Sequence, residues 1–310
     1  MDVVTHGLVG VLVVRAVRSR TSWPVVAAAV GGALAPDLDG VAGLWDPMAA
    51  ITVHRTMTHS LVGGLPLAAG VAAVTKPWGQ ASSFPALAGF AYLGVLSHIG
   101  LDLLNLFGTA VLWPFASRRF GLGWLYVLDP VVTGLVAVAL ALSWWSTVYR
   151  TALPRWAFGM LAAYVLVAGV LGRVGETQWR ALLADQGVSA TRVAVVPTFP
   201  GPLRWVGVAE AERALYRAAF WIGRPSNPTL TTFPKGAMDG LAGLDRTAEV
   251  RTFLAFARFP WLTVTTEGDL RRVEYWDLAF QDHPLGGPMV LRITVDRSGV
   301  VHGVDLGHKL

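Results

Sequence analysis

The stretch HRTMTHSLVGGLPLAAGVAAV, residues 54–74, joins a polar cluster directly to a long apolar run. The first six residues carry two histidines and an arginine, whereas the last fourteen carry no charged side chain. A surface helix of a soluble protein has a polar face, so an uncharged run of this length favours burial in a bilayer. The polar beginning therefore needs its own explanation, because it lies where the chain enters an apolar environment.

The same contrast divides the whole chain of 310 residues, of which 54% are hydrophobic and 15% charged. Average soluble chains carry about 25% charged residues. Residues 1–172 hold nine Lys/Arg and six Asp/Glu, and residues 173–310 hold the other 16 and 14. We therefore predict a membrane-embedded helical domain over residues 1–172 and a soluble domain over residues 173–310.

Six apolar segments define the first domain, and a full membrane span needs about 20 such residues. The fourth to sixth segments meet that length or come close, and the first three are short. Short segments are tilted, re-entrant or extended by polar residues inside a bundle. The sequence thus predicts an α-helical membrane bundle of about six helices. The segments are Val3–Val17, Pro24–Ala35, His59–Val74, Pro85–Phe107, Pro130–Val148 and Trp156–Leu171.

Charges in the connecting loops predict the orientation of this bundle. If the segments cross alternately, one face receives six basic residues and no acidic ones in short loops, which marks it as cytoplasmic. The N-terminus and the C-terminal domain then lie on the extracytoplasmic face of the inner (plasma) membrane. The six basic residues are Arg15, Arg18, Arg20, Lys76, Arg150 and Arg155.

From Arg173 onward the pattern becomes that of a small α+β domain. The stretch GETQWRALLADQGV, residues 175–188, is typical of an amphipathic helix ending at glycine. Residues 192–210, 269–280 and 289–307 have the composition of short strands with Pro and Gly turns. Residues 248–259 favour another helix. The prediction is one small antiparallel sheet with one or two helices.

Composition also excludes several classes of protein. There is no cysteine, so disulfides and thiolate metal ligands are absent. No run rich in Lys or Arg is present, which argues against a nucleic-acid partner. The basic residues near the N-terminus follow the first apolar run, unlike those of a signal peptide, so we expect a retained first helix.

Seven ionisable side chains of the apolar half fall toward one face when the segments cross alternately. His98 and Asp102, spaced i and i+4, share one side of a helix. A buried Asp near the bilayer centre costs roughly 2.5 to 3.5 kcal/mol, so it needs a partner. Taken singly, His6 fits a helix start, PDLD a turn, and His98 with Asp102 a hydrogen-bonded pair. The seven residues are His6, Asp37, Asp39, His54, His59, His98 and Asp102.

Imidazoles and carboxylates together are the ligands of hydrolytic zinc and manganese sites. We predict a divalent metal site with one or two ions, zinc or alternatively manganese. The predicted ligands are His6, Asp37, Asp39, His59, His98 and Asp102, with Asp37 or Asp39 as the bridge of a two-ion site. His54 is a further ligand or a proton shuttle, and Arg55 suits an anionic oxygen.

These residues carry a family resemblance. THG (5–7), PDLD (36–39), HRTMTHS (54–60) and SHIGLDLLNLFGT (97–109) occur in the order found in the YdjM-type family, which this chain resembles over residues 1–172. That family comprises bacterial inner-membrane proteins described as metal-dependent hydrolases, some of them regulated by LexA. The resemblance implies that the eight polar residues named above form the site.

A more distant similarity links His98 and Asp102 to the His-x-x-x-Asp element of zinc-dependent phospholipases C and P1-type nucleases. The chain lacks the His-x-x-x-Glu element of those enzymes and their amino-terminal tryptophan ligand. The resemblance therefore implies one or two ions instead of three.

The expected function is a membrane-embedded, metal-dependent hydrolase of a phosphoester, such as a phospholipid or a lipid-linked phosphate. Amide hydrolysis is an alternative, but the apolar half contains no glutamate to act as a base. A metal-ion or proton transporter is another, since intramembrane His and Asp line such pathways. A third is a non-catalytic membrane scaffold held together by its metal.

Overall fold

The computed structural model describes residues 1–308, except residues 19, 47, 80–81, 147, 225–227, 236–243, 245–246, 281–288 and 298. Two compact units make up the chain. The helical unit consists of Met1–Val41, Val53–Val170 and Pro200–Pro202, and the second unit consists of Ala42–Thr52, Leu171–Phe199 and Leu203–Leu310. A helical N-terminal region is thus followed by a region of antiparallel sheets.

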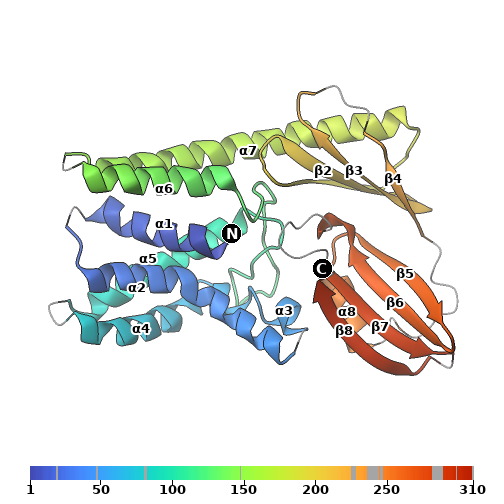
Figure 1. Cartoon of the computed structure of the whole chain (residues 1–310), viewed down its shortest axis with the longest axis horizontal. Coiled ribbons are helices and arrows are strands. Elements are labelled where there is room, and N and C mark those ends of the chain that lie inside the picture. The colour runs from blue at the N-terminus through green and yellow to red at the C-terminus, as the bar shows by residue number, and fades with distance from the viewer. Residues whose placement is uncertain are drawn as a thin grey trace. The chain divides into compact units, whose positions relative to one another are not determined.

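The six predicted apolar segments correspond to six α-helices (Figure 1). Within the helical unit, α2 contacts α1, α4 and α5, and α1 also contacts α6. Two 3-10 helices, η1 (Ala35–Leu44) and η2 (Met57–His59), carry much of the polar sequence. The six helices are α1 (Val3–Val17), α2 (Trp23–Leu34), α4 (Gly64–Thr75), α5 (Phe84–Leu103), α6 (Pro130–Trp145) and α7 (Ala152–Asp185).

The prediction that the third segment begins at His59 was wrong. His59 ends η2, and α4 starts five residues later at Gly64. Residues 57–63 turn tightly instead, with the amide of Ser60 donating to the carbonyl of Met57. Gly63 makes the turn possible, because a Cβ there would lie 2.0 Å from the Met57 carbonyl oxygen. The polar cluster is therefore a separate turn in front of the helix.

Glycines allow α2 and α5 to approach closely, which fixes the position of the polar residues that follow. A Cβ on Gly32 would lie 1.9 Å from the carbonyl oxygen of Ala91, and one on Gly94 would lie 2.1 Å from that of Ala29. Small residues at a helix crossing are typical of bundles in membranes. The C-terminal end of α2 is thereby held against the second half of α5.

Among the described residues, three helical segments are long and apolar enough to cross a membrane: Trp23–Leu44, Phe84–Leu103 and Ala152–Asp185. A fourth exists if Ala49–His59 and Gly64–Trp78, bent by 78° at their junction, count as one span. The second predicted segment reaches this length because η1 prolongs α2. In contrast, α6 ends at Trp145 and remains a shorter apolar helix of 16 residues.

Among its described residues, the second unit contains two four-stranded antiparallel sheets, each with strands in sequential order. Trp179 and Leu183 of α7 pack on the first sheet, and helix α8 (Ala248–Phe256) supplies Val250 and Phe253 to the core of the second. The first sheet comprises β1 (Arg192–Pro197), β2 (Arg204–Glu210), β3 (Ala214–Trp221) and β4 (Thr231–Pro234); the second comprises β5 (Pro260–Glu267), β6 (Leu270–Asp277), β7 (Met289–Asp296) and β8 (Val301–His308).

Two features of this part differ from the prediction. There are two sheets instead of one, because β3, β4 and β5 were not recognised in the sequence. The predicted helices at residues 156–171 and 175–188 are one continuous helix, α7, of 34 residues. No proline interrupts the sequence between them, and Gly172 and Gly175 do not end the helix, which continues from apolar into amphipathic sequence.

Candidate metal centre

The motif PDLD lies in η1, directly after α2, and its two aspartates serve different neighbours. A 3-10 helix has three residues per turn, so Asp37 and Asp39 project about 240° apart. Asp37 faces His59 and His98, with its Oδ1 at 3.4 and 3.5 Å from their Nε2 atoms. Asp39 instead faces the turn that contains His54.

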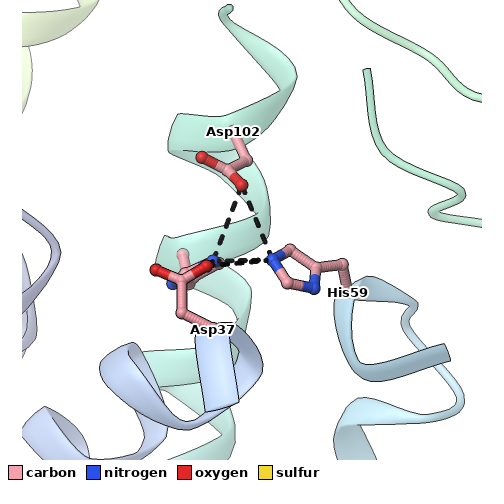
Figure 2. Close-up of side chains that lie close together, drawn as sticks. Asp37, His59 and Asp102 are labelled. Carbon is pink, nitrogen blue, oxygen red and sulfur yellow. Dashed lines mark hydrogen bonds and ion pairs between the residues drawn. The ribbon is translucent and has the colours of Figure 1, made fainter. Parts of the chain in front are cut away.

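Four donor atoms converge at one point: Nε2 of His59, Nε2 of His98, Oδ1 of Asp37 and Oδ2 of Asp102. Five of the six distances among them are 3.1, 3.4, 3.5, 3.6 and 3.7 Å, and all six are within 4.8 Å. Figure 2 shows Asp37, His59 and Asp102 directed toward one another. A tetrahedral zinc site with bonds of about 2.0–2.2 Å has ligand atoms about 3.3–3.6 Å apart. The spacing therefore matches one tetrahedral ion.

Hydrogen bonds on the far side of each imidazole fix which nitrogen carries the proton. His98 Nδ1 lies 2.7 Å from the carbonyl oxygen of Ala33, which can only accept, so Nδ1 donates. His59 Nδ1 lies 3.2 Å from Asp39 Oδ2 and 2.9 Å from Thr58 Oγ1, whose own proton goes to Asp39. In neutral rings both Nε2 atoms are then unprotonated and face each other, an arrangement that a cation stabilises.

Asp102 directs one carboxylate oxygen toward the centre, and its other oxygen accepts hydrogen bonds from neighbouring groups. Its Oδ1 accepts hydrogen bonds from the Met1 amino group and, at 3.3 Å, from Asn105 Nδ2. Its Oδ2, turned toward the histidines, is buried and forms an ion pair with Arg55 Nη2 at 3.1 Å, but it accepts no hydrogen bond of regular geometry among the described residues. The free lone pair of this carboxylate oxygen can therefore bind a cation.

His6 lies beside the four donors. Its ring stacks on that of His98 with centroids 3.7 Å apart, and its Nε2 is 3.4 Å from Asp102 Oδ1. The side chain is fully buried, and neither ring nitrogen has a hydrogen-bond partner among the described residues. His6 is thus available as a further ligand, although it is not within the tightest group of donors.

Asp39 binds the turn of residues 54–59 at four points. Its Oδ1 lies 2.6 Å from His54 Nδ1, and its Oδ2 accepts from the amide of Arg55 at 3.3 Å. Thr58 and His59 are its other two partners. Asp39, His54 and His59 form a second possible metal-binding group. However, His59 could serve both groups only by losing the proton that it gives to Asp39.

Arg55 is almost completely buried next to the centre. Its Nη1 donates to Asn105 Oδ1 at 2.7 Å, its Nη2 lies 3.1 Å from Asp102 Oδ2, and its guanidinium lies over the ring of Phe107. Its backbone adopts a φ of 63°, which is uncommon for a residue with a side chain. Three elements therefore hold the cation within reach of any ligand at the metal position.

The structure brings all eight predicted residues together, from α1, η1, the 54–59 turn and α5. Most are buried, but the side chains of Asp37 and His54 are 26% and 29% exposed, which marks the accessible side of the centre. Sequence reasoning gave no role to Asn105, Thr58 or the Ala33 carbonyl. Asn105 could have been given one, because it follows Asp102 by three residues, just past the end of α5.

Comparisons with known proteins identify a family of inner-membrane proteins. The model of the YdjM inner membrane protein family matches residues 1–175. An uncharacterised protein of Bacillus subtilis (strain 168), YfhP, is 23% identical over 265 residues, which cover 83% of this chain and 77% of YfhP. No solved structure matches significantly.

Proposed function

The chain belongs to the YdjM inner membrane protein family, and on that premise we propose that it is a metal-dependent hydrolase of a membrane-lipid phosphoester. The supporting observation is the convergence of the Nε2 atoms of His59 and His98 with oxygens of Asp37 and Asp102. A centre with only these four groups has a donor set that suits zinc or manganese. His6 is the candidate for a further ligand.

Each neighbour of the four donors has a role in this proposal. Zinc or manganese, when bound, supplies Lewis-acid polarisation of the phosphoryl group and lowers the pKa of water. Asp39 and the Ala33 carbonyl hold the rings of His59 and His98 in the tautomer that leaves Nε2 unprotonated. Asp39 is therefore a positioning residue here and not a ligand.

Arg55 is the reason for proposing an anionic substrate. Its guanidinium is buried, charged and only 3.1 Å from Asp102, so it would share its donors with a phosphoryl oxygen next to the centre. His54, bonded through Nδ1 to Asp39 and partly exposed, would carry the proton. In the balanced reaction, water adds to phosphorus, the ester P–O bond breaks, and the leaving alcohol receives the proton.

The membrane topology is part of the proposal. We place the six apolar helices as crossings, with the basic residues Arg15, Arg18 and Lys76 on the cytoplasmic side. The metal centre and the second unit then face the extracytoplasmic side. Cysteines introduced singly at exposed positions, Ser22→Cys and Leu44→Cys, test this with a membrane-impermeant thiol reagent on intact cells. Only Leu44→Cys should react; labelling of Ser22→Cys alone would reverse the orientation.

The activity is tested by metal analysis of the purified full chain together with hydrolysis of phospholipids and of a soluble phosphodiester. His98→Ala and Asp102→Ala should lose both bound metal and activity. Arg55→Ala should keep its metal and lose about tenfold to a hundredfold in kcat/KM, since a charge-assisted hydrogen bond contributes about 1.5–3 kcal/mol. Arg118→Ala, which removes an exposed arginine, is the matched control.

The outcomes separate the alternatives. A wild-type protein without divalent metal contradicts the proposal outright. A protein that binds metal but hydrolyses neither class of phosphoester would instead favour a scaffold or a transport pathway. Transport sites tend to lie near the bilayer midplane, whereas the donors here gather after the C-terminal end of α2 and in the second half of α5.

A further inference from the structure

A long apolar groove lies between α2 and α4 in the helical unit. Its lining follows one stripe of each helix at helical spacing, including Trp23, Val30 and Leu38 on one side and Leu67 and Trp78 on the other. The two helices run in opposite directions: Gly79 lies against Pro24, whereas Gly31 lies against Val71. The groove therefore extends along the full length of α2.

The groove offers a ligand almost nothing but hydrocarbon. It has a volume of about 1070 Å³, and its only hydroxyl side chains are Thr21 and Thr75. Thr75 uses its hydroxyl within its own helix, donating to the carbonyl of Val71 at 2.9 Å. An occupant of this groove is therefore bound mainly by apolar contact.

The two ends of the groove differ in chemistry. At one end lie Trp23, Trp78 and Trp144, all largely exposed, as is typical of side chains at a membrane–water interface. At the other end lies Leu38, between Asp37 and Asp39 of the metal centre. From Trp23 to Leu38 the α-helical and 3-10 rises add to about 24 Å. One leaflet of hydrocarbon is about 15 Å thick, so a whole acyl chain fits along the groove.

We propose that this groove binds an acyl chain of a membrane phospholipid whose head group lies at the Asp37 end. That this lipid is the substrate of the metal centre rests on the proposed function. If the groove binds its acyl chain, the substrate is a long-chain lipid instead of a soluble phosphoester. The bilayer supplies this ligand at the open side of the groove.

A phospholipid carrying a diazirine on one acyl chain tests the binding directly, with the full chain in phosphatidylethanolamine and phosphatidylglycerol vesicles. Photocrosslinks should concentrate on the facing stripes of α2 and α4. A probe near the head group should label residues around Leu38, and a probe at the methyl end should label residues farther toward Trp23. Equal labelling of the exposed face of α7, or crosslinks between two copies, would overturn the proposal.

Gly70→Phe is the variant that fills the groove. Gly70 lines it, and a Cβ added there meets no atom within 4 Å, so the ring can enter the groove without a clash. Gly159→Phe is the matched control, because Gly159 is equally open on α7 but does not line the groove. Crosslinking should fall about tenfold in Gly70→Phe and remain unchanged in the control. Unchanged crosslinking in Gly70→Phe would contradict the groove as the binding site.

Hydrolysis separates this inference from the proposed function. Gly70→Phe should lose about tenfold in kcat/KM on a long-chain phospholipid and keep full activity on bis(p-nitrophenyl) phosphate, which has no acyl chain. Equal rates of Gly70→Phe and wild type on both substrates would refute the groove. Crosslinks in the groove without hydrolysis of either substrate would support acyl binding and contradict the proposed hydrolase.

Discussion

Asp37 and Asp39 show how two residues of one short motif acquire different tasks. Asp37 offers an oxygen to the point where His59 and His98 meet, whereas Asp39 is surrounded by hydrogen-bond donors. The difference follows from the 3-10 helix, whose period turns the two side chains to different sides. The function of each carboxylate is thus decided by backbone geometry instead of residue type.

Asp39→Asn should weaken metal binding about tenfold to a hundredfold without abolishing it. The amide keeps an acceptor oxygen for His54 but no longer provides a negative charge opposite His59 Nδ1. Metal affinity is measured by competition with a coloured chelator. Asp46→Asn is the control, since Asp46 is an exposed loop residue that accepts one backbone hydrogen bond. Complete loss of metal in Asp39→Asn would instead make Asp39 a ligand.

The sequence was sufficient to predict which polar residues lie close together but not which contacts each of them makes. His6, His98 and Asp102 could be assigned to one end of the bundle because each lies at a definite position in an apolar helix. The assignment of Asp39 needed the 3-10 conformation after α2, which has no distinctive pattern in APDLDGVAGL. The tautomer of His98 depends on the backbone carbonyl of Ala33, a contact that no sequence pattern indicates.

At the scale of elements, Asp129 joins two apolar helices. It caps α6, accepting from the amides of Val131 and Val132 at 3.0 and 3.2 Å. Its Oδ2 also accepts the hydroxyl proton of Tyr164 from α7 at 2.8 Å. One buried carboxylate therefore fixes the start of α6 and the position of α7 beside it.

Asp129→Ala should lower the free energy of unfolding of the full chain in detergent by about 2–4 kcal/mol, because it removes the cap and leaves the Tyr164 hydroxyl unpaired. Tyr164→Phe, which removes the hydroxyl and keeps the cap, should lower it by about 1 kcal/mol. Equal losses in the two variants would show that the cap contributes nothing. Chemical denaturation followed by circular dichroism measures both.

Asp277 likewise joins separate elements through hydrogen bonds, here in the second sheet. Its carboxylate accepts from the amides of Arg258, Phe259 and Ala279 at 2.7, 3.0 and 3.0 Å and so joins the end of β6 to the residues before β5. Burial raises the pKa of Asp277 above its usual value, although the three amides oppose the rise. The folded state therefore binds a proton at a pH where the unfolded state does not.

The resulting pH dependence has a definite sign. Between about pH 4, where an unfolded Asp titrates, and the raised pKa of Asp277 in the fold, the contribution of this group to stability decreases as pH rises. The free energy of unfolding of the second unit, measured by guanidinium titration at several pH values, should show this decrease. Asp277→Asn should flatten it. A wild-type curve identical in slope to that of the variant would contradict the buried-carboxyl explanation.

Element by element, the apolar helices could be predicted because apolar composition and capping residues agree at their ends. Strands β3 and β4 were missed, since ALYRAAFW carries no strict alternation and TTFP is only four residues long. The continuity of α7 was missed for another reason. Its composition changes at Arg173 although its backbone does not, so a change of environment was interpreted as a change of element.

At the scale of the whole molecule, the division of charge along the chain matches a division of architecture. The helical unit is bound together by close helix crossings and, in our proposal, by a metal that links α1, η1, the 54–59 turn and α5. The second unit has its own apolar cores, in which residues such as Trp179, Trp205 and Phe253 are fully buried. The two units should therefore respond differently to loss of the metal.

Removal of the metal with a strong chelator should destabilise the helical unit selectively. Binding at a thousand times Kd stabilises the folded state by about 4.1 kcal/mol, and the loss falls on segments that share the ligands. Amide hydrogen exchange, measured by mass spectrometry, should rise in residues 33–39, 54–60 and 97–105 and remain constant in β5–β8. His98→Ala should show the faster exchange before any chelator is added and no further change afterwards. Once the cation is gone, the two facing unprotonated Nε2 atoms and the two carboxylates repel one another, so the segments that carry them should open more often. Equal protection of the wild type with and without chelator would therefore mean that these four groups hold no structural ion.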